Sequence, residues 1–428
     1  MNSKTIESKN TDTHSVFIQT NRPNKSLLIF ILGSLAALAP FSIDMYLPSF
    51  AAIATDLHTS IGQVTLSLSS YFIGMAAGQL LYGPLLDKYG RKKPLYVGLT
   101  VYLLASFGCM IKGGTIDSLI ALRFIQAVGS CAAGVAAMAM VRDLFPVEEN
   151  AKVFALLMLV VGASPMVAPT IGGYVTATLG WRAIFLILAL LASVILAAVI
   201  FILPDTYKPN KSLSLKPRPI LNNFRTVLLD PQFFTYAFTG SIAFSGLFAY
   251  VAGSPMIFMK VYMVSEQMYG WIFAGLSVGF IGSSQVNNLL MKKFRSEQII
   301  PTALLTQVVI GILFIVCAAN NWLNLFSFLA MLFLMLCCVG IIGPNANALS
   351  LAPFTQHAGS ASSLMGAIQL GIGALASVVT GLFEKPSIVP LAMAMSCSAV
   401  VAYIVLFIGR KYITTTVVQS ENETSLIH

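Results

Sequence analysis

The chain has 428 residues, of which 57% are hydrophobic and only 10% are charged, and its mean hydropathy is +0.83. Soluble globular proteins carry about 25% charged residues, so this composition excludes a set of soluble domains and predicts a chain that lies mostly in a membrane. The net charge of +9 does not indicate nucleic-acid binding, because the basic residues cluster in short loops between apolar runs. That distribution is the orientation signal of a membrane protein.

Residues 1–25 are rich in Ser, Thr, Asn and Lys, and we expect them to form a disordered cytoplasmic N-terminus. A membrane-spanning helix needs about 20 apolar residues. By this measure the chain contains twelve candidate spans, at 26–50, 62–84, 94–113, 117–141, 150–177, 181–203, 231–259, 267–291, 298–319, 322–346, 359–383 and 387–409. These runs leave no stretch large enough for a soluble catalytic domain.

A polar segment rich in Pro, Lys and Asn, at 204–230, separates the first six runs from the last six. We therefore predict an all-α integral membrane protein with twelve transmembrane helices in two six-helix halves. The predicted units are a bundle at 26–203, a cytoplasmic linker at 204–230, a second bundle at 231–409 and a cytoplasmic tail at 410–428. With both termini in the cytoplasm, the outer loops hold only Lys112, Arg182, Lys260 and Lys385 of the 25 Lys and Arg residues.

The two halves share a weak internal repeat at an offset of 204 residues, which aligns Leu85, Leu86, Lys88, Arg91 and Gly162 with Leu289, Leu290, Lys292, Arg295 and Gly366. Parallel halves with weak internal similarity are typical of secondary transporters. Chance identity within apolar sequence is the alternative.

Asp44 is the one ionisable residue in the first apolar run. A carboxylate at the bilayer centre costs about 2.5–3.5 kcal/mol on insertion scales, so we treat it as a functional residue. Arg123, in the fourth run, shares a helix face with Gln126. At a rise of about 1.5 Å per residue, Asp44 and Arg123 reach a similar depth, and we expect them to share an aqueous cavity. The alternatives are a wet helix end for Asp44 and snorkelling to the headgroups for Arg123.

The loop after the second run reads GPLLDKYGRKKPL, from Gly83 to Leu95. Glycine and proline predict a tight turn at the membrane surface, in which Asp87 would cap a helix or pair with a basic residue. A purely topogenic loop is the alternative, although that role requires only the positive charges. In the fifth run, Gly162–Gly173 reads GASPMVAPTIGG, and its small residues and two prolines predict close packing of a bent helix.

These stretches resemble the major facilitator superfamily. The loop is similar to the family signature G-x-L-a-D-r-x-G-r-k-x-x-l, a conformational latch between the halves, which assigns that role to Gly83, Asp87, Gly90, Arg91 and Lys92. Arg123-Phe-Ile-Gln126-Ala-Val-Gly129 resembles R-x-x-Q-G-x-G and implies that Arg123 takes part in proton coupling. The motif G-P-x-x-G-G, which marks antiporters, is matched around Pro165, Pro169, Gly172 and Gly173. At the second-half positions of the latch aspartate and glycine stand Met291 and Phe294, so only the first latch looks intact.

The sequence SIDMYLP, from Ser42 to Pro48, narrows the resemblance to the Bcr/CflA group of bacterial bicyclomycin and chloramphenicol resistance proteins. The resemblance implies a drug:proton antiporter of the bacterial inner membrane. Such a protein exports hydrophobic drugs by alternating access, is driven by the proton gradient and needs no cofactor. An exporter of one endogenous metabolite, such as an amino acid, peptide or sugar, is the alternative on the same fold. We expect a monomer that is not an enzyme, because the sequence offers neither a nucleophile with a positioned base nor a metal cluster.

Asp44 is the expected proton site, because burial favours its protonated form and a nearby Arg123 favours its ionised form. Such a carboxyl can load a proton outside and release it inside as the halves rock. At the repeat offset its position is taken by Phe248, so the second half does not repeat the carboxylate. Helix position suggests a substrate cavity of apolar, aromatic and amide groups: Phe41, Tyr46, Tyr71, Gln126, Phe244, Tyr250, Asn345 and Gln369. These aromatic residues could instead face lipid or neighbouring helices.

Overall fold

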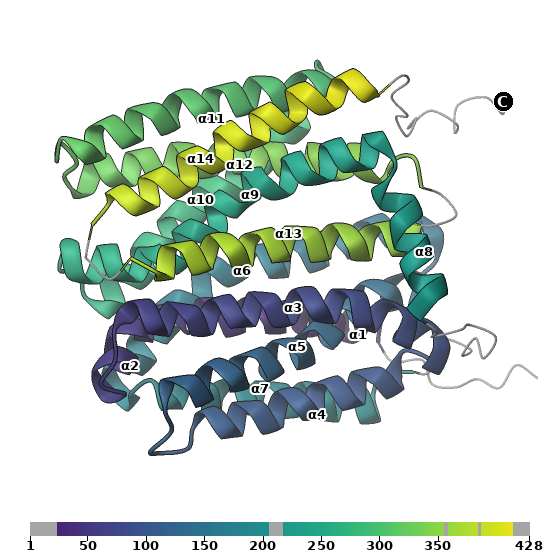
Figure 1. Ribbon diagram of the computed structural model, residues 1–428. Helices are drawn as coiled ribbons and strands as arrows, with labels where there is room; N and C mark the ends of the chain where they lie inside the picture. Colours follow the sequence, from purple (N-terminus) through teal and green to yellow (C-terminus); the bar gives the residue numbers. More distant parts are fainter. Residues whose placement is uncertain (1–23, 205–216, 355–357, 384–386, 414–428) are drawn as a thin grey trace, which may run out of the picture.

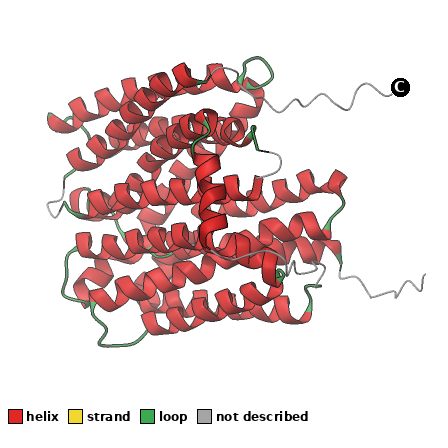
Figure 2. Ribbon diagram, turned by 45° about the vertical axis from the view of Figure 1, so that its right-hand side comes forward, coloured by secondary structure: helices red, strands yellow, loops and turns green. Residues whose placement is uncertain are grey.

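A computed structural model describes residues 24–204, 217–354, 358–383 and 387–413. Nearly all of the predicted N-terminal segment, the linker part at 205–216 and the tail beyond 413 lie outside the described residues. Within the described ranges every regular element is a helix (Figure 2). The predicted all-α membrane fold is confirmed.

The helices of the first half are α1 (Lys25–Asp44), the 3-10 turn η1 (Leu47–Ser49), α2 (Phe50–Asp56), α3 (Ile61–Tyr89), α4 (Lys92–Cys109), α5 (Ile116–Leu144), α6 (Val147–Leu179) and α7 (Arg182–Phe201). The remaining helices are α8 (Pro217–Leu228), α9 (Pro231–Met256), η2 (Ile257–Val261), α10 (Glu266–Leu290), α11 (Ser296–Ala319), α12 (Leu325–Leu351), α13 (Ala358–Gly381), α14 (Val389–Gly409) and η3 (Arg410–Tyr412). With α1 to α2 taken as one segment, 10 of the described segments are long and apolar enough to cross a membrane. The more polar α4 and α10 pack along such segments, α4 against α5 and α7 and α10 against α6 and α12.

The helices form two bundles, α1 to α7 in purple and blue and α9 to α14 in teal to yellow (Figure 1). The main contacts between them run along α3 with α13 and along α6 with α10. The offset of 204 residues relates helix starts as well as sequence: Lys92, which opens α4, corresponds to Ser296, which opens α11. The internal repeat is therefore also a repeat of helix positions.

The first predicted span corresponds to one segment that is long and apolar enough to cross a membrane, Lys25–Asp56, but this segment is divided, because α1 ends at Asp44 and the chain passes through η1 into α2. Pro48 gives the physical reason. A proline has no N–H, and its ring collides with the carbonyl four residues earlier, which here belongs to Asp44. The predicted carboxylate thus sits at the residue where α1 ends.

The tight turn predicted from Gly83 onward begins later. α3 continues through Gly83 and Pro84 to Tyr89, so Asp87 lies on its last turns. Membrane helices tolerate an internal proline when neighbouring groups satisfy the freed carbonyl. The turn itself falls at Gly90, whose φ of +84° is easily adopted only by glycine.

The linker contains a helix, α8, that the polar composition did not predict. Ile220, Phe224 and Val227 recur at helical spacing, and Val227 is fully buried. This face packs against α9 and α13, and the helix crosses the ends of the bundle helices (Figure 1). The linker is therefore partly a structured element attached to the second half.

At the end of the bundle where α2 leads into α3, opposite α8, the two halves meet backbone to backbone. We call this the distal end. A Cβ atom on Gly62 would lie 2.5 Å from the carbonyl oxygen of Gly381, and one on Gly173 would lie 2.5 Å from that of Glu266. Because real side chains do not fit at such distances, glycine is what allows the distal ends to close.

Gly62→Ala should therefore destabilise this closed arrangement. We expect a loss of about 1–3 kcal/mol from overpacking, seen as a lower apparent melting temperature of the purified protein in detergent. Gly275→Ala is the matched control, because a Cβ there meets no atom within 4 Å. Alanine should leave α10 unchanged or slightly more stable. Equal melting temperatures for the two variants would show that Gly62 is not needed for closure of the distal end.

Candidate functional site

The polar centre of the first half lies at the break after α1. In a continuing helix the N–H of Tyr46 would bond the carbonyl of Ser42, but here it bonds the carbonyl of Ile43 at 3.2 Å. The Ser42 carbonyl is therefore one of the orphan acceptors at a helix C-terminus. Arg123 of α5 satisfies it, with Nη2 donating at 3.0 Å.

Arg123 is completely buried. Its guanidinium lies 4.1 Å from the ring centroid of Tyr71 and 4.5 Å from that of Tyr46, distances at which a cation is attracted by the ring faces. Nη1 donates to Oε1 of Gln126 at 2.6 Å, as the shared helix face predicts. The charge also sits at the C-terminal end of α1, where the helix dipole favours a cation.

A set of hydroxyl groups extends this site across α1, α3, α4 and α5. Gln126 Nε2 donates to the Ser106 hydroxyl at 2.8 Å. Three hydroxyl pairs follow, Tyr46 with Ser67 at 2.7 Å, Tyr71 with Ser130 at 2.8 Å and Ser42 with Tyr102 at 2.7 Å. We call these nine residues, including Arg123, the Arg123 network. All are buried, and the network leaves Nε as the one unpaired nitrogen of Arg123.

Asp44 lies beside this network but is not part of it. The residue is 6% exposed, and its Oδ2 accepts one long hydrogen bond, 3.4 Å from the hydroxyl of Ser164 on α6. No ion pair joins Asp44 and Arg123 in the described part of the chain. The two predicted coupling residues thus share the α1 break without direct contact. The turn η1, which follows Asp44, contacts α9 and α10 of the second half, and Tyr250 of α9 and Tyr269 of α10 lie in one apolar cluster with Tyr46 and Leu47.

The predicted substrate residues fall into different environments. Tyr46, Tyr71 and Gln126 belong to the Arg123 network. Asn345 of α12 is buried and donates to Asn287 of α10 at 2.7 Å, a contact within the second half. The others are Phe41 and Gln369, both half-buried, Phe244, whose ring lies 5.5 Å from that of Phe248, and Tyr250, which stacks on Phe273 at 5.5 Å. A role in substrate contact stays a prediction for all of them.

The latch loop is centred on Arg91, which is 9% exposed. Its Nε donates to Asp143 Oδ2 and its Nη1 to Asp87 Oδ1, each at 2.7 Å. Burial works against the guanidinium charge, but the bonds to Asp143 and Asp87 outweigh it and raise the pKa of Arg91. Asp87 therefore pairs with a basic residue, one of its two predicted roles.

The latch loop meets the second half on α3. A Cβ atom on Gly83 would lie 3.1 Å from the hydroxyl of Ser363 on α13. Lys92 stays within the first half, with Nζ 5.9 Å from the ring centroid of Tyr96. The ion pairs of the loop thus fix α3, α4 and α5 to one another, while glycine provides the contact between the halves.

The predicted close packing of the fifth run is confirmed. α6 is one helix that contains Pro165 and Pro169. A Cβ atom on Gly172 would overlap the carbonyl oxygen of Met45, and Gly173 touches Glu266 at the start of α10. The two glycines therefore hold α6 against both the α1 break and the other half.

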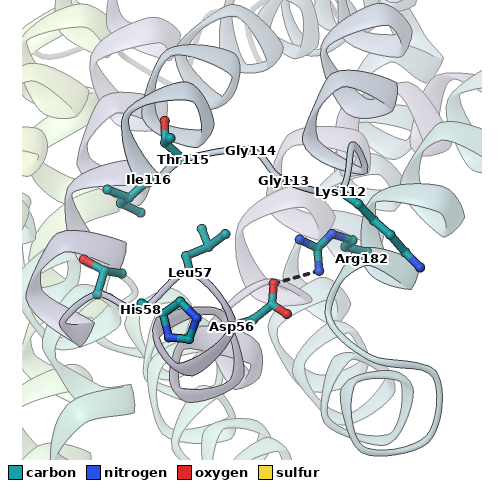
Figure 3. A pocket seen from close by; sticks show the side chains of 10 residues that line it. Asp56, Leu57, His58, Lys112, Gly113, Gly114, Thr115, Ile116 and Arg182 are labelled. Carbon is teal, nitrogen blue, oxygen red and sulfur yellow. Dashed lines mark hydrogen bonds and ion pairs between the residues drawn. The ribbon is translucent and has the colours of Figure 1, made fainter.

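A cavity of about 630 Å³ opens at the distal end (Figure 3). It is lined by Asp56, Leu57, His58, Thr59, Lys112, Gly113, Gly114, Thr115, Ile116 and Arg182. Arg182 pairs with Asp56 at 2.8 Å and lies 4.2 Å from the ring centroid of Trp181. None of the predicted site residues lines this cavity, which belongs to the loops of the first half.

A helical bundle with these features can be compared with known proteins. The family model described as the Major Facilitator Superfamily matches residues 32–378. The chain belongs to the major facilitator superfamily. This match confirms the family that the sequences of the latch loop, the helix with Arg123 and the α6 glycines resemble.

Relatives and solved structures agree with the family. A bicyclomycin resistance protein homolog of Haemophilus influenzae is 34% identical over 90% of this chain and 96% of its own. The multidrug resistance protein MdtL of Shigella flexneri is 29% identical over 79% of this chain and 84% of its own. In structure, a D-xylose–proton symporter gives a TM-score of 0.67 at 13% identity, with 89% of this chain and 96% of that chain covered. A bacterial homolog of the human lysosomal transporter Spinster, in an inward-facing conformation, gives 0.69 at 14%, with 90% and 95% covered. These structural likenesses concern the fold alone.

The sequence did not single out Asp143, Ser164, Tyr102 or Ser42. Asp143 had a readable signal, because it is an acidic residue beside Arg142 at the end of a membrane helix, near the basic latch loop. The hydroxyl residues had none, because serine and tyrosine are common in membrane helices and only packing decides which of them meet.

Arg123→Lys should damage the protein although it keeps the charge. A lysine cannot stack on two rings and also donate to Ser42 and Gln126 through a planar fork. We expect a loss of about 2–3 kcal/mol from unsatisfied buried acceptors, measured as a lower apparent melting temperature. The exposed Arg142, on the same helix, provides the control Arg142→Lys, which should stay within about 0.5 kcal/mol. Indistinguishable variants would refute a capping role for Arg123.

The latch loop should depend on Asp143 more than on Asp87. The Asp143 side chain is 17% exposed and that of Asp87 is 48% exposed. An exposed ion pair contributes about 0–1 kcal/mol, whereas a more buried charged hydrogen bond contributes about 1.5–3 kcal/mol. Melting curves of Asp143→Asn and Asp87→Asn should therefore show the larger loss for Asp143. The reverse order would show that the described pairing does not hold the loop.

Proposed function

We propose that this protein is a proton-coupled antiporter that exports hydrophobic, drug-like compounds across the bacterial inner membrane by alternating access. The observation that carries the proposal is the buried Asp44 carboxylate, placed at a forced helix break that faces the second half. Two relatives whose names refer to bicyclomycin resistance and multidrug resistance support the substrate class. The working unit is a monomer that needs no cofactor and catalyses no reaction.

The proposed coupling uses the two charges at the α1 break differently. Arg123 is a fixed cation, held by Ser42, Gln126 and two aromatic rings, and it keeps the break in one shape. Asp44 has a single long hydrogen bond, so little in this state opposes its protonation. A proton taken up at Asp44 from one side and released to the other, as the halves rock, would exchange for substrate.

Orientation in the membrane follows from the basic residues. Both termini and the latch loop lie on the cytoplasmic side in this proposal, because cytoplasmic loops carry the excess of Lys and Arg. The distal end is then periplasmic, and the arrangement described here is closed on that side by Gly62, Gly173 and their partners. Half-buried aromatic rings such as Phe244, Phe248 and Phe280 would offer apolar surface to a substrate that enters from the cytoplasm.

Asp44→Asn should abolish efflux that is driven by a pH gradient, because an amide cannot carry a proton between the two sides. The measurement is bicyclomycin and chloramphenicol resistance, together with drug-induced proton movement in everted membrane vesicles, in a strain that lacks its own exporters. Asp56→Asn is the control, since that carboxylate lies at the distal surface in a half-exposed ion pair and should leave transport nearly unchanged.

Two outcomes would count against the proposal. Full gradient-driven efflux by Asp44→Asn would remove the proton site. Resistance to no drug, combined with export of one amino acid, peptide or sugar, would replace the drug substrate with a dedicated metabolite.

A further inference from the structure

The hydroxyl of Tyr250 is an anomaly in this structure. The side chain is 2% exposed, and its oxygen is buried with no hydrogen-bond partner. Its ring is well packed, stacked on Phe273 at 5.5 Å with an interplanar angle of 20°. A buried hydroxyl without a partner is destabilising. Packing therefore accounts for an aromatic ring at position 250 but not for its hydroxyl group.

A neighbouring tyrosine provides the contrast. Tyr269 of α10 is also completely buried, but its hydroxyl pairs with that of Ser254 on α9 at 2.8 Å. Both phenols lie in one apolar cluster with Tyr46 and Leu47, which follow Asp44, because α9 and α10 contact η1. Only Tyr250 therefore has a free donor among the two phenols that the second half brings near the carboxylate.

The Asp44 carboxylate has unused capacity to accept hydrogen bonds. Ionised Asp44 can accept about four hydrogen bonds, yet Ser164 provides only one, at 3.4 Å. The other titratable or charged groups that the described elements bring to this region are Arg123 from α5, Tyr46 after α1, Tyr71 from α3 and Tyr102 from α4. These four are engaged in the Arg123 network. The unused donor and the carboxylate with unused acceptor capacity thus sit on opposite halves of the protein.

We propose that Tyr250 is the second half's contribution to the proton site, donating its hydroxyl to the ionised carboxylate of Asp44 when the halves shift. This inference rests on the proposed function and makes Tyr250 a positioning residue for proton coupling. A hydrogen bond to a charged acceptor is roughly twice as strong as one between neutral groups. The bond therefore holds α9 against the α1 break when Asp44 is ionised and weakens when Asp44 takes up a proton. The second half thus responds to the protonation state of Asp44 in the first half.

The test is a pH titration of the Asp44 carboxyl in the purified full-length protein, by infrared difference spectroscopy. The carboxyl signal of Asp44 is defined as the one that Asp44→Asn removes. Tyr250→Phe deletes only the hydroxyl that stabilises the ionised form, so proton binding becomes easier. The titration midpoint should move to higher pH by about one unit.

Tyr269→Phe is the matched control, because it deletes a phenol oxygen near Asp44 that is already paired with Ser254. Its midpoint should stay unchanged while its melting temperature falls, since Ser254 loses its partner. Tyr250→Phe should show the opposite pattern, with an unchanged or higher melting temperature and a shifted midpoint. A merely structural role for Tyr250 would lower stability and leave the midpoint in place.

An unshifted midpoint in Tyr250→Phe, or an equal shift in both variants, would overturn the inference. The titration uses no drug, so its result is independent of the substrate. Failure of drug efflux in the wild-type protein would refute the proposed function, whereas failure of the titration would refute only the role of Tyr250.

Discussion

The break after α1, which Pro48 imposes, is the constraint on which the rest of the first half depends. The Ser42 carbonyl at this helix C-terminus has no backbone partner. Inside an apolar bundle an unsatisfied carbonyl costs several kcal/mol. Arg123 resolves this defect, and its own charge then requires the two tyrosine rings and Gln126. The hydroxyl pairs of α3, α4 and α5 follow from those rings. The end of one helix thus accounts for a network spread over four helices.

The two halves share helix positions but not chemistry. The first half concentrates its buried polar groups in bonded networks around Arg123 and Arg91. At the offset position of Asp44 the second half has a neutral residue, Phe248, which packs its ring 4.6 Å from that of Phe72 across the interface. Buried side-chain atoms without partners occur in both halves, on residues that include Arg123, Asn150 and Arg182 in the first half and Thr239, Tyr250, Gln307 and Asn345 in the second. The ion pairs of the described residues all lie in the first half.

Much of this arrangement could be predicted from the sequence, because the bilayer restricts the possible structures. Apolar run length placed the helices, and the spacing of Arg123 and Gln126 placed both on one face. The break at Asp44 was missed because hydropathy does not register a lost N–H at Pro48, although the proline rule predicts it. A shared cavity for Asp44 and Arg123 was expected from depth alone, and depth cannot say which of several acceptors a guanidinium reaches. Asp143 and Ser164 were missed because tertiary packing brings them to their partners.

The glycine contacts at the distal end have a mechanical consequence. At Gly62 and Gly173 no side chain separates the backbones of the two halves, and none of the ion pairs among the described residues joins the halves, so parting this end breaks no ion pair. The contact is held instead by dispersion and by the apolar cluster that combines Phe50 and Val64 of the first half with Tyr250 and Phe273 of the second. A gap of about 1 Å already loses up to about half of a dispersion contact. Closure of the distal end therefore depends on the fit of apolar surfaces rather than on charge.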